Sequence, residues 1–104
     1  MKSINKLLVA TLLLLLSSYT IADAISPGKS KSETCLGCHA IPGYNNVYPT
    51  YKVPKLAGQH ADYIILALKA YRANDRNHDT MHANAVGLSD KDIDDIAKYF
   101  ESLK

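Results

Sequence analysis

Apolar residues recur with the period of a helix near the end of the chain. The positions that follow this period are Ile93, Ile96, Ala97, Phe100 and Leu103. They share one face of a helix. Ser89 and Asp92 precede them in a pattern like a capping box, with Asp in place of the usual Glu or Gln. We therefore expect an amphipathic helix over residues 89–103, with one face in the core.

A second helix is expected over residues 59–74. This stretch lacks glycine and proline and is rich in helix-forming residues. Its apolar residues cover most of the helical circumference, so the helix is expected to be largely buried. A shorter helix is expected to lead into Cys35, after a flexible turn at Pro27 and Gly28.

Two segments between these patterns lack a helical period. The first, residues 40–58, contains the breakers Pro42, Gly43, Asn45, Asn46, Pro49, Pro54 and Gly58. They indicate a long irregular loop without regular structure, which is uncommon in a small domain unless it wraps around something. The second segment, residues 75–88, is polar and contains Met81. No strand pattern is present, and the sequence predicts an all-α fold of three to four short helices and long loops.

The first 24 residues have the composition of a secretory signal peptide. Lys2 and Lys6 precede an apolar stretch over residues 7–16, and the small-residue sequence Ala22-Asp23-Ala24 follows. A membrane anchor is the alternative, but the apolar stretch is roughly half of the about 20 residues that span a bilayer. We expect cleavage after residue 24, a periplasmic protein, and no membrane span in the mature chain.

Residues 25–104 are then expected to form one small domain. The whole chain has one Phe and no Trp, and a domain of this size with so few large aromatics needs a disulfide, a metal or a cofactor to support its core. Loss of two lysines and one aspartate with residues 1–24 lowers the formal net charge from +2 to +1. A nearly neutral chain has no electrostatic surface for nucleic acid, so we expect no nucleic-acid partner.

The run from Cys35 to His39 is a Cys-x-x-Cys-His motif, which is typical of covalent attachment of a c-type haem. Two thiols at this spacing form thioethers with the two vinyl groups of the porphyrin, and the adjacent imidazole reaches the iron. The alternatives are less consistent with the sequence. Zinc would need further ligands, and no second cysteine pair exists. A thioredoxin-like pair would need a βαβ pattern, and a disulfide would not explain His39.

The second axial ligand has one leading candidate. Met81 is the only methionine after residue 24 and lies between polar residues. A thioether opposite His39 favours reduced iron, as in Met/His cytochromes. His60, His78 and His82 remain competing ligands.

Three motifs in order make the chain resemble the class I cytochromes c, most closely their small bacterial periplasmic single-haem members. They are the Cys35–His39 motif, the sequence Val53–Gln59 leading into a helix, and Met81 followed by Leu88–Ile93 and the terminal helix. The resemblance implies that an N-terminal helix crosses the C-terminal helix and that one haem edge is exposed. It implies one covalently bound haem c within the cytochrome c fold.

The resemblance also implies roles for residues around the haem. The carbonyl of Pro54 would accept a hydrogen bond from His39, and Leu56 would pack on the ring. The candidates for contact with the haem propionates are Tyr48, Tyr51 and Arg76.

These observations predict an electron carrier and not an enzyme. Cys35 and Cys38 would hold the haem, His39 and Met81 would ligate the iron, and redox proteins would be transient donors and acceptors. Two other classes stay open. The domain could be the electron-accepting subunit of a dehydrogenase or respiratory complex, or a haem sensor in which Met81 leaves the iron to a small ligand.

Overall fold

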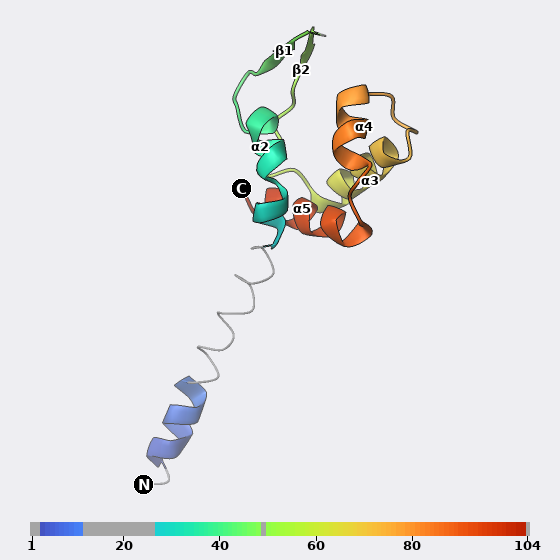
Figure 1. The fold of residues 1–104 in the computed structure, drawn as a ribbon. Helices are drawn as coiled ribbons and strands as arrows, with labels where there is room; N and C mark the ends of the chain where they lie inside the picture. Colours follow the sequence, from blue (N-terminus) through green and yellow to red (C-terminus); the bar gives the residue numbers. More distant parts are fainter. Residues whose placement is uncertain (1–2, 12–26, 49, 104) are drawn as a thin grey trace.

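The computed structural model describes residues 3–11, 27–48 and 50–103 (Figure 1). Its elements are α2 (Glu33–His39), β1 (Asn45–Val47), β2 (Thr50–Lys52), α3 (Ala61–Arg72), α4 (Asp79–Ala85) and α5 (Asp90–Ser102). Residues 3–11 and 27–31 are also helical. The mainly helical architecture confirms the predicted fold class.

The predicted signal peptide is described only in part. Residues 3–11 are exposed throughout, and the expected cleavage sequence, Ala22-Asp23-Ala24, lies outside the described residues. Over the three ranges that the structure describes, no helix combines the length and the apolar character that crossing a bilayer requires.

Helix α5 begins at the predicted capping box. The Ser89 hydroxyl accepts a hydrogen bond from the Asp92 amide at 3.1 Å, and the Asp92 carboxylate accepts one from the Ser89 amide at 3.0 Å. These bonds satisfy two of the amides that a helix start leaves without partners. The terminal helix is therefore confirmed, within one residue of each predicted end.

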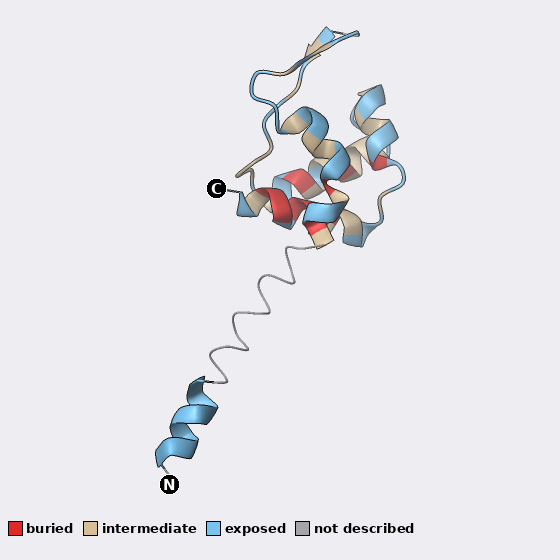
Figure 2. Ribbon diagram, turned by 60° about the vertical axis from the view of Figure 1, so that its left-hand side comes forward, coloured by how far each residue is buried: buried red, intermediate tan, exposed pale blue. Residues whose placement is uncertain are grey.

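The core lies between α3, α4 and α5 (Figure 2). Its buried apolar residues are Ile64, Leu68, Ala85, Ile93, Ile96, Ala97, Tyr99 and Phe100. Helix α3 is present as predicted, but the prediction that it is largely buried is wrong. Only Ile64 and Leu68 are buried in it, and Leu66 is 69% exposed, because α4 and α5 cover only part of its circumference.

The N-terminal helical segment crosses α5 at Gly28. A Cβ atom at this position would lie 2.0 Å from the Asp95 carbonyl oxygen, so only glycine allows the two backbones to approach this closely. The predicted crossing of N- and C-terminal helices is confirmed. The predicted flexible turn at Pro27 and Gly28 is wrong, because both residues are helical and the turn lies at Ser32.

Residues 45–52 contain a hairpin where the sequence predicted no regular structure. Strands β1 and β2 pair antiparallel, with Asn46 opposite Tyr51 and Val47 opposite Thr50. Strands of three residues are too short to produce a visible alternation in sequence. The hairpin projects from the helical body in Figure 1, and Val47 is 84% exposed.

The segment from residue 75 to 88 is also more ordered than predicted. Met81 lies in helix α4 and not in a polar loop. A helix of seven residues with mostly polar or small side chains has no clear apolar period, so the sequence did not predict it.

Candidate functional site

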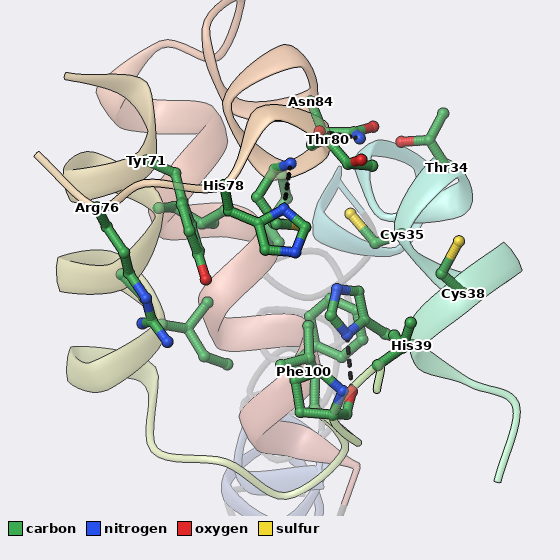
Figure 3. Close-up of a pocket in the computed structure, with 18 of the residues that line it drawn as sticks. Thr34, Cys35, Cys38, His39, Tyr71, Arg76, His78, Thr80, Asn84 and Phe100 are labelled. Carbon is green, nitrogen blue, oxygen red and sulfur yellow. Dashed lines mark hydrogen bonds between the residues drawn. The ribbon is translucent and has the colours of Figure 1, made fainter. Parts of the chain in front are cut away.

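A cavity of about 470 Å³ opens between α2, the segment after β2, and helices α3 to α5 (Figure 3). This volume is in the range of sites for small molecules and cofactors, about 300–1,000 Å³. Apolar side chains line its inner part, among them Leu56, Ile64, Leu68, Ile96 and Phe100. An apolar group of substantial size would complete this part of the core.

Helix α2 brings the Cys-x-x-Cys-His residues to one wall of the cavity. Cys35, Cys38 and His39 are separated by three and four positions, which places them on one helical face. Both cysteines are free thiols, and burial raises the pKa of Cys35. The two sulfurs lie near each other in Figure 3.

The ring of His39 is oriented by the backbone of the following loop. Its Nδ1 lies 2.7 Å from the carbonyl oxygen of Pro54. Because a carbonyl only accepts, Nδ1 carries the hydrogen and Nε2 keeps a free lone pair. The hydrogen bond that the resemblance implied is present, and it gives His39 the tautomer that a metal-ligating histidine needs.

Helix α4 supplies the facing wall. Met81 lines the cavity and packs partly buried against the core. His78 also lines the cavity, but its Nδ1 accepts a hydrogen bond from the Met81 amide at 3.3 Å. His82 does not line it, and its Nδ1 lies 2.8 Å from the Tyr71 carbonyl. The His60 side chain is 80% exposed outside the cavity, so of the four candidate ligands only Met81 and His78 line the cavity with His39.

Polar groups gather at the end of the cavity away from the cysteines, as Figure 3 shows for Arg76 and Tyr71. The Arg76 guanidinium lies 4.8 Å from the centre of the Tyr71 ring and donates to the Tyr63 hydroxyl at 3.4 Å. The hydrogen bond to Tyr63 raises the pKa of Arg76, which keeps it charged. No Asp or Glu in the described part of the chain lines the cavity.

The three candidates for contact with the propionates therefore differ in whether they line the cavity. Arg76 and Tyr51 line the cavity, and the Tyr51 hydroxyl donates to the Thr80 hydroxyl at 3.1 Å. Tyr48 is 94% exposed and does not line it. Tyr63 and Tyr71 also line the cavity, although they were not predicted from the sequence as site residues. Their signal was the four-residue spacing of Tyr63, Ala67 and Tyr71, which all line the cavity.

The residues present fit a covalently attached haem. The two thiols correspond to the vinyl groups of the haem. The imidazole with a free Nε2 and the facing thioether correspond to its iron, and the apolar interior corresponds to its ring. A cation at the far end corresponds to its propionates. A mainly helical fold around such a cavity is the arrangement of a c-type cytochrome.

The comparison with known families agrees with this class. The family model for cytochrome c matches residues 25–104, and the chain belongs to this family. It is a class I c-type cytochrome with a covalently bound, iron-containing c-type haem, and it acts in haem-based electron transfer with redox partners.

Individual relatives differ in how much of them the chain covers. Cytochrome c-554(548) of Halomonas halodenitrificans is 44% identical over 84 residues, which are 78% of this chain and 98% of that protein. Cytochrome c4 of Pseudomonas aeruginosa is 38% identical over 103 residues, 96% of this chain but 49% of that protein. A thiosulfate dehydrogenase electron acceptor of Thiomonas intermedia is 32% identical over 98 residues, which are 94% of this chain and 43% of that protein.

A solved structure shares the fold. The crystal structure of reduced recombinant cytochrome c4 from Pseudomonas stutzeri superposes with a TM-score of 0.61 and 28% sequence identity, over 80% of this chain and 50% of that one. The chain thus spans 98% of one relative and between 34% and 50% of the cytochromes c4.

Proposed function

We propose that this cytochrome is a periplasmic carrier with a single haem and His/Met axial ligation. Cys35 and Cys38 form the two thioethers, and His39 and Met81 ligate the iron. The observation that carries the proposal is the cavity itself, which is lined by both thiols and His39 from α2 and by Met81 from α4. The chain has only two cysteines, enough for one doubly attached haem.

The haem would supply one-electron chemistry by cycling its iron between ferrous and ferric states. His39 and Met81 would together hold the iron, which would leave no position on it for a substrate. The Pro54 carbonyl holds His39 at a fixed orientation. Leu56 lines the cavity and would pack against the haem ring. This arrangement suits electron transfer with little rearrangement and supports a carrier, not an enzyme.

The propionates would lie at the Arg76 end of the cavity. In haem, the two propionates stand on the edge opposite the two vinyl groups, and the vinyl groups would be anchored at Cys35 and Cys38. Arg76 lies across the cavity from these cysteines in Figure 3. A guanidinium is well suited to bind a carboxylate, and the absence of Asp and Glu from the described lining favours anionic groups there.

The experiment that tests the proposal combines intact mass with absorption spectra. The full chain is produced in a bacterium that matures c-type haem and is purified from the periplasm. We expect the mass of residues 25–104 plus one haem, and a weak long-wavelength band of ferric iron bound by methionine. Met81→Ala should keep the attached haem and lose this band.

Each of the other possible results would contradict one part of the proposed function. Protein without attached haem would overturn the role of Cys35 and Cys38. Attached haem with an unchanged band in Met81→Ala would overturn the ligand assignment, and a retained N-terminus would overturn periplasmic export with cleavage.

Two further measurements separate the alternatives. Carbon monoxide binding by the ferrous protein at neutral pH would favour a sensor with an open iron position. Stable co-purification with a larger dehydrogenase would favour an electron-accepting subunit. A free carrier should resist carbon monoxide and purify alone, because redox carriers form small, transient interfaces.

A further inference from the structure

The short helix α4 carries Met81, and a hydrogen bond from a histidine side chain begins it. His78 is the N-cap residue, with extended backbone, and its Nδ1 accepts the hydrogen of the Met81 amide at 3.3 Å. The His78 ring also lies edge-on to two tyrosines, with ring centres 4.6 Å from Tyr51 and 6.1 Å from Tyr71. The start of α4 is therefore attached both to its own third residue and to the cavity wall.

A second histidine ties the same helix to α3. The Nδ1 of His82 lies 2.8 Å from the carbonyl oxygen of Tyr71, which is in the last turn of α3. The Tyr71 carbonyl also accepts a hydrogen bond from the Asn74 amide at 3.1 Å, and its second lone pair is available to a side-chain donor. Since the carbonyl accepts, His82 donates from Nδ1 and holds α4 against α3.

We propose that His78 and His82 are positioning residues that keep Met81 directed into the cavity, and that neither is an axial ligand. The inference rests on the proposed role of Met81. A helix of seven residues is only marginally stable by itself, so its position depends on such contacts. The two histidines flank Met81, one three positions before it and one directly after it.

Competition by imidazole for the ferric iron tests the proposal. Imidazole occupies the iron when Met81 leaves it, so its apparent affinity reports how firmly Met81 is held. We expect His78→Ala and His82→Ala each to raise this affinity by about fivefold, the equilibrium equivalent of one lost cap or hydrogen bond. The long-wavelength methionine band should also disappear at a lower temperature than in the wild type.

Asparagine variants distinguish the hydrogen bonds from general packing. His78→Asn keeps a good N-cap acceptor, and His82→Asn keeps a donor near the position of Nδ1. Both should bind imidazole nearly as weakly as the wild type. His60→Asn is the matched control, because His60 is exposed outside the cavity, and it should change nothing.

Three results would overturn the proposal. Alanine variants with unchanged imidazole affinity would show that the histidines only stabilise the fold, even if global unfolding becomes easier. Asparagine variants as impaired as the alanine variants would exclude the assigned hydrogen bonds. A changed axial-ligand spectrum in His78→Asn would show that His78 is itself a ligand. Failure of the proposed function looks different, since Met81→Ala would then bind imidazole no better than the wild type.

Discussion

Residues 33–60 and residues 61–103 differ sharply in how they are held. Among the described residues, the first region contains no buried side chain, although it includes α2, the hairpin and the Pro54 loop. The second region contains every buried apolar residue of the described core. Residues 61–103 form the buried core and also line the cavity, whereas residues 33–60 line the cavity without contributing a buried side chain.

The difference shows where the fold depends on its cofactor. Close packing supplies most of the dispersion energy of a core, and side chains that line a cavity have no partner on that side. Cys35 and Leu56 are partly buried against the core, and both line the cavity. A haem in the cavity would complete their contacts and bury further apolar surface, at about 25 cal/mol per Å².

The largest expected effect is therefore the loss of the haem. The double variant Cys35→Ser, Cys38→Ser cannot form thioethers, and we expect its haem-free chain to be largely unfolded. Circular dichroism at the helix bands should show most of the helical signal lost relative to the haem-containing wild type. Native-like helical content in this variant would contradict the dependence of the fold on haem.

A smaller effect is expected when a glycine is replaced by alanine. The two positions compared are Gly28, where the N-terminal segment crosses α5, and Gly37 in α2. Gly28→Ala places a Cβ against the backbone of α5, which no rotamer change relieves, and should lower the free energy of unfolding by about 1–3 kcal/mol. Gly37 lies in the exposed part of α2, and a Cβ there meets no atom within 4 Å.

The matched variant Gly37→Ala should instead be neutral or stabilise the protein by up to about 1 kcal/mol, because alanine favours a helix over glycine. Urea unfolding of the haem-containing proteins measures both. Equal effects at the two positions would mean that the N-terminal segment does not cross α5 as closely as described.

The smallest effect concerns acid stability. Lys31 contacts Asp92 at 2.8 Å and Asp95 at 2.7 Å. Hydrogen bonds with Lys31 and then with Ser89 lower the pKa of Asp92 from 3.8 to about 2. Hydrogen bonds with Lys31 and then with Lys91 lower the pKa of Asp95. Because the pKa values are lower in the folded state, this stabilisation is present above about pH 4 and is lost as the pH falls toward 2.

Lys31→Gln should lower stability at neutral pH and make the decline between about pH 4 and 2 shallower. Urea midpoints measured across this range test the expectation, with Lys29→Gln as the control at an exposed neighbouring lysine. An unchanged slope in Lys31→Gln would mean that the ion pairs between the N-terminal segment and α5 do not contribute.

Much of the scaffold was predictable because its causes are local. The period of Ile93, Ile96 and Phe100 predicted α5, and Ser89 with Asp92 predicted its capping box. Helix α3 was predicted from its composition. The Pro54 hydrogen bond to His39 was implied by the family resemblance, not by a residue pattern.

Other features depend on contacts that no local pattern reports. The hairpin has strands of three residues, and α4 lacks an apolar period. Gly28 indicated a turn in the sequence. In the structure, its lack of a side chain lets the N-terminal segment pass close to the Asp95 carbonyl of α5. The exposure of Leu66 follows from which sides of α3 its neighbours cover.

The amino-acid sequence by itself determined the helical class and the adjacency of Cys35, Cys38 and His39, because helix periodicity and the spacing of the motif are properties of consecutive residues. Only the tertiary structure decided that Met81 lines the same cavity as these residues, with His78 and His82 hydrogen-bonded to backbone groups around it. His39 and Met81 are far apart in the sequence, and they reach one cavity through the packing of the helices, which depends on the shape of the whole core.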